Sequence, residues 1–239
     1  MSRDVIWHDL ECGGYREDLP LWRALAAVEG GPVLDVGAGT GRVTLDLAAR
    51  GTDVVALDTD ASLLDELERR ATGLPVETVV ADARDFGLGR RFSLVLVPMQ
   101  TLQLLGGAAG RAAFLRCALD HLERGGLLAA ALADAIDCFD EDHELPPPPD
   151  AREVDGSYYA SHLLAVEDHG GRAAIRRRRE IVGPGDRYES REVVVRLDRV
   201  SADEVAAEAR ELGLSSGRHL DVPETEEYLG STVVVLRAP

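Results

Sequence analysis

The chain has 239 residues, with 26 basic against 43 acidic side chains, for a formal net charge of −17. So acidic a chain repels phosphate backbones, which argues against general nucleic-acid binding. No apolar stretch reaches the roughly 18 residues that cross a bilayer. No apolar signal region follows Met1, so we expect a cytoplasmic protein with no membrane partner.

The cysteines are few and far apart. Cys12, Cys117 and Cys138 form an odd set with wide spacings, which predicts neither a metal site nor a disulfide framework. We interpret them as small apolar side chains of a protein in a reducing compartment.

Strand-like and helix-like patterns alternate over residues 17–124. Short apolar runs predict strands at 33–36, 54–57, 76–80 and 92–97, and a fifth at 127–132 after the turn signal Gly125-Gly126. Segments with apolar residues at helical spacing lie between these predicted strands. This order predicts a Rossmann-like α/β fold: a mostly parallel sheet with helices on both faces and a ligand at the carboxyl edge.

The pattern changes after the fifth strand. The proline run 146–149 predicts an extended, exposed segment. From Ser157 to Asp198 the apolar period becomes two, with turn signals at 170–171 and 183–186. We expect three antiparallel strands here, in an inserted cap spanning 139–199.

A helix and a strand follow the cap. Ser201 and Glu204 have capping-box spacing before a helix, and residues 232–236 form a β-branched strand. We therefore expect a single domain over 1–239, in which residues 1–30 form a lid and a first helix.

A glycine loop carries the strongest chemical signal. Gly37, Gly39 and Gly41 stand between a buried strand and a helix, where glycine lets the backbone turn sharply and approach a ligand. Arg42 stands where a dinucleotide fingerprint has its third glycine. A phosphate-binding P-loop is excluded because the chain has no lysine.

Two carboxylates end the next two strands. Asp58 can accept both hydroxyls of a ribose, and Asp82 can accept from an adenine amino group. Taken singly, Asp58 could cap a helix and Asp82 a turn. Their joint spacing from the glycine loop favours a nucleoside lying along the strand ends.

These features resemble class I S-adenosylmethionine-dependent methyltransferases, and most of all those with small-molecule acceptors. The resemblance rests on Leu34–Gly41, Asp58, Asp82-Ala83, the strand end at Pro98-Met99-Gln100 and the turn at 122–127. It implies a seven-stranded sheet with a reversed final hairpin. It also implies in-line methyl transfer from S-adenosylmethionine to an oxygen, nitrogen or carbon nucleophile, with S-adenosylhomocysteine as product.

Position by position, the resemblance implies the cofactor contacts. Asp35 would anchor the loop near the methionyl amino group, while Gly37, Ala38 and Gly39 would contact the methionyl part and the ribose. Asp58 would hold the ribose hydroxyls beside Thr59, and Asp82 with Ala83 would hold the adenine. Pro98, Met99 and Gln100 would line the sulfonium, and Tyr15 and Arg23 would close over the methionyl carboxylate.

A catalytic base is not required, because a sulfonium already activates its methyl group and proximity can suffice. Candidate bases are His162 and Tyr158, on a strand face that we expect to cover the cleft, and His8, in the expected lid. The structural alternatives are a packed, hydrogen-bonded His162 and an N-terminal arm that is merely docked by Trp7.

Other polar residues have two interpretations each. Asp134 and Asp137 are candidates for acceptor contact or helix capping, and His143 is expected to be exposed. Arg176–Arg179 predicts an ion-paired sheet face, with binding of an anionic acceptor as the alternative.

Two other functions stay open at this point. One is a nicotinamide-dependent oxidoreductase on a similar sheet, against which Arg42 argues. The other is a non-catalytic nucleoside-binding protein. A small-molecule acceptor is the expected partner, and the sequence leaves a homodimer through the inserted sheet open.

Overall fold

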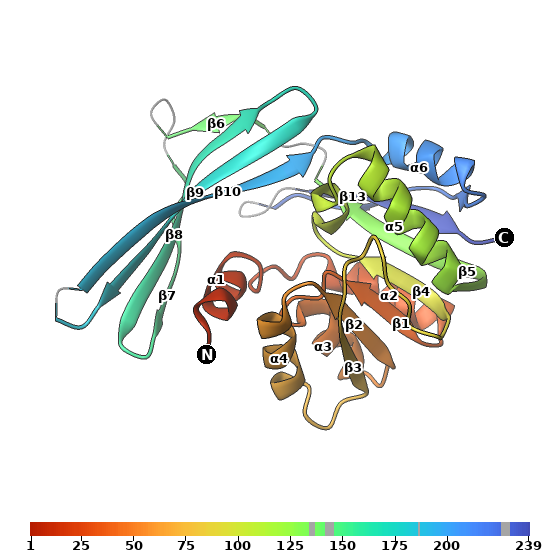
Figure 1. Ribbon diagram of the computed structural model, residues 1–239, viewed down its shortest axis with the longest axis horizontal. Coiled ribbons are helices and arrows are strands. Elements are labelled where there is room, and N and C mark those ends of the chain that lie inside the picture. Colours follow the sequence, from red (N-terminus) through yellow and green to blue (C-terminus); the bar gives the residue numbers. More distant parts are fainter. Residues whose placement is uncertain (134–136, 142–145, 186, 226–229) are drawn as a thin grey trace.

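The structure is a computed structural model that describes residues 1–133, 137–141, 146–185, 187–225 and 230–239. Two sheets dominate it, one of eight strands and one of five, with a short helix between them (Figure 1). The described part of the chain contains no helix with both the length and the apolar composition of a membrane-spanning segment.

The larger sheet is a parallel Rossmann-like sheet with an antiparallel edge. Its parallel strands lie in the order β3-β2-β1-β4-β5, and β13 runs antiparallel beside β5. The bounds are β1 (Val33–Val36), β2 (Val54–Asp58), β3 (Val76–Val80), β4 (Phe92–Val97), β5 (Leu122–Leu132) and β13 (Ser231–Arg237). The carboxyl ends of β1 to β5 therefore meet at one edge, where ligands bind in such sheets.

The sheet has eight strands rather than the seven expected. The extra strand arises because β11 (Ser215–Ser216) and β12 (Leu220–Val222) both pair antiparallel with β13. The reversed final hairpin is present, but its first arm is divided into two short pieces.

Helices cover both faces of this sheet. Buried residues of α5 (Ala108–His121) and α6 (Ala202–Glu211) pack in one core cluster, and those of α2 (Leu19–Glu29) and α3 (Arg42–Ala48) in another. The helix α4 (Ala61–Arg70) supplies a third cluster. The predicted capping box of α6 is confirmed: Ser201 and Glu204 bond each other's backbone N–H.

The expected turn at Gly125-Gly126 is wrong. β5 already begins at Leu122, and these glycines lie inside it, where the pairing register with β4 shifts between Phe92 and Leu94. Gly125 adopts a φ of +71°, which only glycine takes easily. The glycine pair is therefore an irregularity within a strand.

The smaller sheet, called the cap below, contains the three predicted antiparallel strands. They are β8 (Ser157–Asp168), β9 (Arg172–Gly183) and β10 (Arg187–Asp198). Two shorter strands, β6 (Phe139–Asp140) and β7 (Asp150–Val154), pair with β8. The prolines at 146–149 are exposed and belong to no helix or strand.

The helix between the sheets is α1 (Arg3–Glu11), shown in red in Figure 1. Its Trp7 ring meets Tyr159 of the cap edge-on, with ring centroids 5.2 Å apart. Ile6 and Ile181 are buried in the same cluster. This packing docks the start of the chain against the cap.

Candidate functional site

The glycine loop between β1 and α3 needs its glycines. Gly37, Gly39 and Gly41 all have positive φ, at +74°, +55° and +91°. A Cβ would lie 2.5 Å from Thr101 Oγ1 at Gly37, and 2.2 Å from His8 Nε2 at Gly39. The loop therefore has both the conformation and the close neighbours that exclude other residues.

Asp35 is buried at the carboxyl end of β1, just before this loop. Its Oδ2 accepts a hydrogen bond from the Thr44 hydroxyl at 2.6 Å, whereas its Oδ1 has no partner among the described residues. Burial raises the pKa of Asp35 to about 6, although the Thr44 bond opposes the rise. A buried oxygen without a donor is costly, so it suits a ligand that brings one.

Asp58 joins the end of β2 to the glycine loop. Its Oδ2 accepts from the Gly39 N–H at 2.8 Å and its Oδ1 from the Asp60 N–H at 3.0 Å. A carboxylate accepts about four hydrogen bonds, so roughly two positions remain for a ligand. The helix cap of α4 is Asp60, which accepts from the N–H groups of Ser62 and Leu63, so Asp58 is not the cap.

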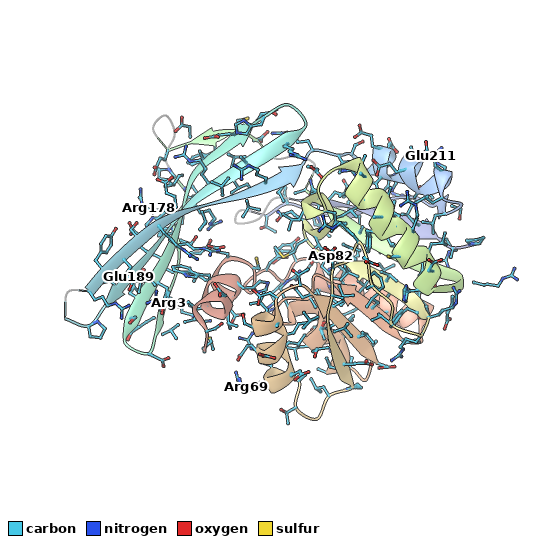
Figure 2. All side chains as sticks on the ribbon, in the orientation of Figure 1. Arg3, Arg69, Asp82, Arg178, Glu189 and Glu211 are labelled. Carbon is cyan, nitrogen blue, oxygen red and sulfur yellow. The ribbon has the colours of Figure 1, made fainter. Side chains whose placement is uncertain are left out.

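Asp82 follows β3 at the same edge and is labelled in Figure 2. It accepts from the backbone N–H of Arg84 at 2.8 Å and from that residue's guanidinium. These contacts lower the pKa of Asp82 to about 2, the side chain of Arg84 being the largest cause. In the structure, Asp82 therefore caps a turn, which is the alternative given above. Ala83 beside it is buried.

The loop after β4 approaches the glycine loop. Met99 has a φ of +55°, unusual for a residue other than glycine, and packs against the core. Thr101 donates to the Pro98 carbonyl at 3.1 Å and lies against Gly37. Strained backbone of this kind clusters at functional sites, and Gln100 follows it directly.

Helix α1 covers the glycine loop. The His8 ring packs on Gly39, and its Nδ1 lies 3.3 Å from Thr40 Oγ1. The same hydroxyl donates to Asp9 at 2.7 Å, and Asp9 also pairs with Arg70. Burial lowers the pKa of His8, against the opposing charges of Asp9 and Asp58. His8 is therefore a largely buried ring that favours its neutral form.

Two other residues predicted near the cofactor contact side chains of α3. Arg23 pairs through two nitrogens with Asp46 of α3, at 2.7 and 2.6 Å. The ring of Tyr15 is buried, and the Arg42 guanidinium lies 5.1 Å from its centre. Thr59 is exposed.

A buried ion pair behind the loop was not predicted. Both nitrogens of the Arg42 fork bond the Asp18 carboxylate, the second at 2.8 Å, and the two side chains are 7% and 3% exposed. Trp22 also donates to Asp18, at 2.7 Å. The one signal in the sequence that could have indicated this pair is Arg42, which stands where a dinucleotide fingerprint has its third glycine.

The expectation that the strand face with Tyr158 and His162 covers the cleft is wrong. Tyr158 is 48% exposed, and His162 lies 3.3 Å from Glu180 on its own sheet. The opposite face, with Tyr159 and Ser161, contacts α1. Asp137 is exposed, and Asp134 and His143 lie outside the described residues.

The arginine run agrees with the ion-paired interpretation. Arg179 bonds Glu11 of α1 at 2.8 and 2.6 Å, and Arg176 pairs with Glu167 at 3.0 Å. Arg177 bonds Ser161 and Asp150, and Arg178 pairs with Glu180. No guanidinium of the run is left over for an anionic acceptor.

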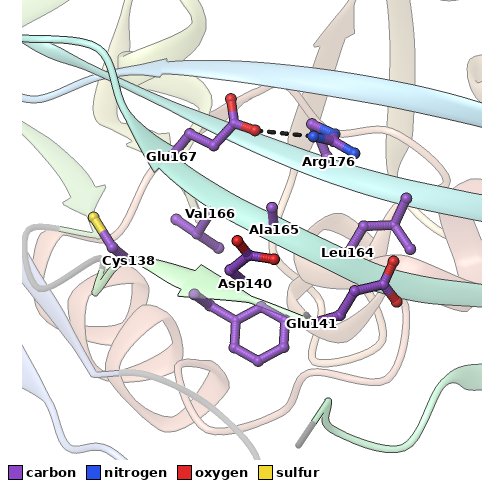
Figure 3. A pocket seen from close by; sticks show the side chains of 9 residues that line it. Cys138, Asp140, Glu141, Leu164, Ala165, Val166, Glu167 and Arg176 are labelled. Carbon is purple, nitrogen blue, oxygen red and sulfur yellow. Dashed lines mark hydrogen bonds and ion pairs between the residues drawn. The ribbon is translucent and has the colours of Figure 1, made fainter. Parts of the chain in front are cut away.

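One pocket lies within the cap (Figure 3). It has a volume of about 340 Å³ and is lined by β6 with its neighbours Cys138 and Glu141, by residues of β8 and by Arg176, none of them from the glycine loop. Among the described residues no cluster of His, Cys, Asp and Glu could hold a metal ion.

Comparisons with known proteins point in one direction. Residues 33–126 match the family described as a methyltransferase domain. The chain is 32% identical over 146 residues to a cypemycin N-terminal methyltransferase of a Streptomyces species, which covers 61% of this chain and 57% of that protein. It is 47% identical over 64 residues to a demethylmenaquinone methyltransferase of Clavibacter sepedonicus, 26% of each chain. The matches thus span little more than half of these relatives at most.

Solved structures extend the likeness to the whole fold. The sugar N-methyltransferase KedS8 of a Streptoalloteichus species superposes with a TM-score of 0.77 at 20% identity, over 100% of this chain and 94% of that one. The amino pentose methyltransferase CalS10 of Micromonospora echinaspora gives 0.73 at 19% identity, over 100% and 98%. Residues 33–126 thus match the methyltransferase domain family, and the whole chain shares the Rossmann-like fold of these two solved structures.

Proposed function

We propose that this protein transfers a methyl group from S-adenosylmethionine to the amine nitrogen of a small molecule. The observation that carries the proposal is Asp35 Oδ1, a buried carboxylate oxygen without a donor beside the glycine loop. The methionyl part of the cofactor bears an ammonium group, which would supply that donor.

The rest of the edge fits the nucleoside part. Asp58 keeps acceptor positions for ribose hydroxyls after bonding Gly39 and Asp60. The positive φ of the loop glycines gives the backbone its sharp turn at this edge. Asp82 can accept a hydrogen bond from an adenine amino group in addition to its bonds from Arg84.

The chemistry asks little of the chain beyond positioning. The bound sulfonium supplies an activated methyl group. The amine lone pair would bond to the methyl carbon as the carbon–sulfur bond breaks, with the electron pair of that bond staying on sulfur, and the new ammonium nitrogen would lose a proton to water. The chain orients the two partners, and α1 and the β4 loop help to exclude water. His162 and Tyr158, on the far face of the cap, take no part in this arrangement.

The choice of an amine has support from the similar proteins. The relatives named above include an N-terminal methyltransferase and a sugar N-methyltransferase. A nicotinamide oxidoreductase has no such support, and Arg42 at the third-glycine position is already bonded to Asp18. Three free cysteines suit action in the reducing cytoplasm.

Calorimetric titration with S-adenosylmethionine tests the cofactor. We expect Asp58→Ala to weaken binding by about 1–3 kcal/mol, because it removes the acceptors proposed for the ribose hydroxyls. Asp53→Ala, at the amino end of β2 and largely exposed, is the matched control and should bind as the wild type does. Wild-type protein that shows no binding would overturn the proposal.

Turnover separates an enzyme from a binding protein. The protein should form S-adenosylhomocysteine when given amino sugars or peptides with free amino termini, and the product should carry the extra methyl on nitrogen. Cofactor binding without turnover on any amine would instead favour the non-catalytic alternative.

A further inference from the structure

A second pocket lies behind the glycine loop, between the core and the cap. It has a volume of about 540 Å³. It is lined by residues of α1, the segment before α2, α2 itself, the end of the glycine loop, α3, the end of α4 and β7: Asp9, Gly13, Arg16, Leu19, Arg23, Thr40, Gly41, Arg42, Leu45, Asp46, Arg70 and Arg152. Gly37, Gly39, Asp58 and Asp82 are not among them. The pocket therefore adjoins the proposed cofactor edge but does not coincide with it.

Its lining is positively charged in a strongly acidic protein. Five arginines line it against two aspartates, whereas the whole chain has a net charge of −17. Arg23 pairs with Asp46, and Arg70 with Asp9. Arg42 is held by Asp18 behind the pocket wall.

Two of the five pocket arginines have no acidic partner for their side chains among the described residues. Within the described ranges, neither the Arg16 nor the Arg152 guanidinium makes a hydrogen bond or ion pair, although the Arg16 carbonyl accepts from the Leu19 N–H and Arg152 pairs with Tyr159 along β8. Arg16 lies near enough to Asp46 to help lower the pKa of that carboxyl, after the larger effect of Arg23. Arg152 and Arg16 thus leave two guanidinium groups facing a cavity that holds no further acid.

The two arginines come from different parts of the fold. Arg16 precedes α2 in the core, while Arg152 is in β7 of the cap, directly opposite Tyr159 in the sheet register. Because Tyr159 contacts Trp7, this is the face of the cap that meets α1. The pocket is therefore formed jointly by core and cap.

We infer that this pocket binds an oxyanion group, a phosphate or a carboxylate, through Arg16 and Arg152. A guanidinium offers planar paired donors that match both groups, and charge-assisted bonds of this kind are the stronger ones. The site does not depend on methyl transfer. It is also separate from the cofactor, so protein loaded with cofactor should still bind the anion.

Calorimetric titration with inorganic pyrophosphate and, separately, with malonate tests this site at low salt. We expect saturable binding to wild-type protein and a loss of at least about tenfold in Arg152→Glu and in Arg16→Glu. Arg124→Glu is the matched control, since Arg124 is also exposed, lies near the start of β5 and makes no contact with the pocket. The probe that binds more tightly identifies the source of the oxyanion as phosphate or carboxylate.

Two results would overturn the inference. One is equal anion affinity in the wild type, Arg16→Glu and Arg152→Glu. The other is loss of anion binding when the protein is saturated with S-adenosylhomocysteine, because the anion would then be occupying the methionyl carboxylate position. S-adenosylmethionine affinity, measured on the same samples, reports separately on the proposed function.

Discussion

The side-chain amide of Gln103 bonds the backbone of Ala133 in both directions. Its nitrogen donates to the Ala133 carbonyl at 3.0 Å, and its oxygen accepts from the Ala133 N–H at 2.9 Å. The same nitrogen donates to the Asp198 carbonyl at 3.0 Å. Ala133 follows β5 and Asp198 ends β10. One buried side chain thus holds the chain where it leaves the core for the cap and where it returns.

Replacing Gln103 by leucine should destabilise the protein. Three buried backbone groups would lose their partner, and each unpaired group costs about 1–3 kcal/mol, so we expect a loss of about 3 kcal/mol or more in the free energy of unfolding. Urea denaturation measures it. Gln103→Glu should also destabilise the protein, because it keeps the acceptor for the Ala133 N–H but sets a buried carboxylate against two carbonyl oxygens. Equal stability of the leucine variant and the wild type would contradict a clamping role.

Gly39→Ala should weaken cofactor binding about tenfold or more, because the added Cβ would meet the His8 ring at 2.2 Å. His8→Ala in the same chain should recover part of the affinity, leaving only the strain of the positive φ. Gly51→Ala is the matched control, since Gly51 has a φ of +88° with nothing within 4 Å of its Cβ. Identical affinities of the single and double variants would show that His8 is not the obstacle.

Cofactor affinity should rise as the pH rises through about 6, the pKa of Asp35 in the unliganded protein. An ammonium ligand needs the ionised carboxylate, so binding releases a proton below this pH. Since burial raises this pKa above its ordinary value of 3.8, Asp35 stabilises the unliganded fold fully below pH 3.8 and loses that contribution as the pH passes about 6.

Titrations on both sides of pH 6 check the effect. Asp35→Asn should bind the cofactor weakly and without this pH dependence. His8→Gln should keep the dependence, which separates Asp35 from the histidine. A wild-type affinity that is flat through pH 6 would contradict the assignment of Asp35.

Asp18→Ala should cost about 3–5 kcal/mol of stability, because it leaves the buried Arg42 charge unpaired. Asp53→Ala is the surface comparison. Asp53 pairs with Arg90, but the two side chains are 55% and 35% exposed, so about 1 kcal/mol or less is expected. Thermal or urea unfolding measures both. A similar small loss in the two variants would show that the Asp18–Arg42 pair contributes no more than a surface pair.

Much of the core could be predicted because its signals are local. The strand at Val33–Val36, the glycines after it and the carboxylate Asp58 lie within about one βαβ unit, where hydrophobic period and glycine positions determine the structure. The capping box of α6 depends only on Ser201 and Glu204. The sheet edge therefore followed from sequence without knowledge of distant contacts.

The features that could not be predicted depend on distant partners. Period two in β8 showed that Tyr158 and Tyr159 point to opposite faces, but the buried face was decided by Trp7, about 150 residues away in the chain. The pair of Arg42 with Asp18 likewise depends on how α2 packs on α3. The Gly125 irregularity depends on strand register, which composition does not reveal.

Neighbouring side chains of α1 contact different parts of the molecule. Trp7 packs on the cap, His8 and Asp9 contact the glycine loop, and Glu11 bonds Arg179 and Ser161 of the cap. Exchanging the cap between related proteins to change the acceptor would therefore break contacts that also hold the glycine loop. A working chimera would therefore have to exchange residues 3–11 together with residues 139–198.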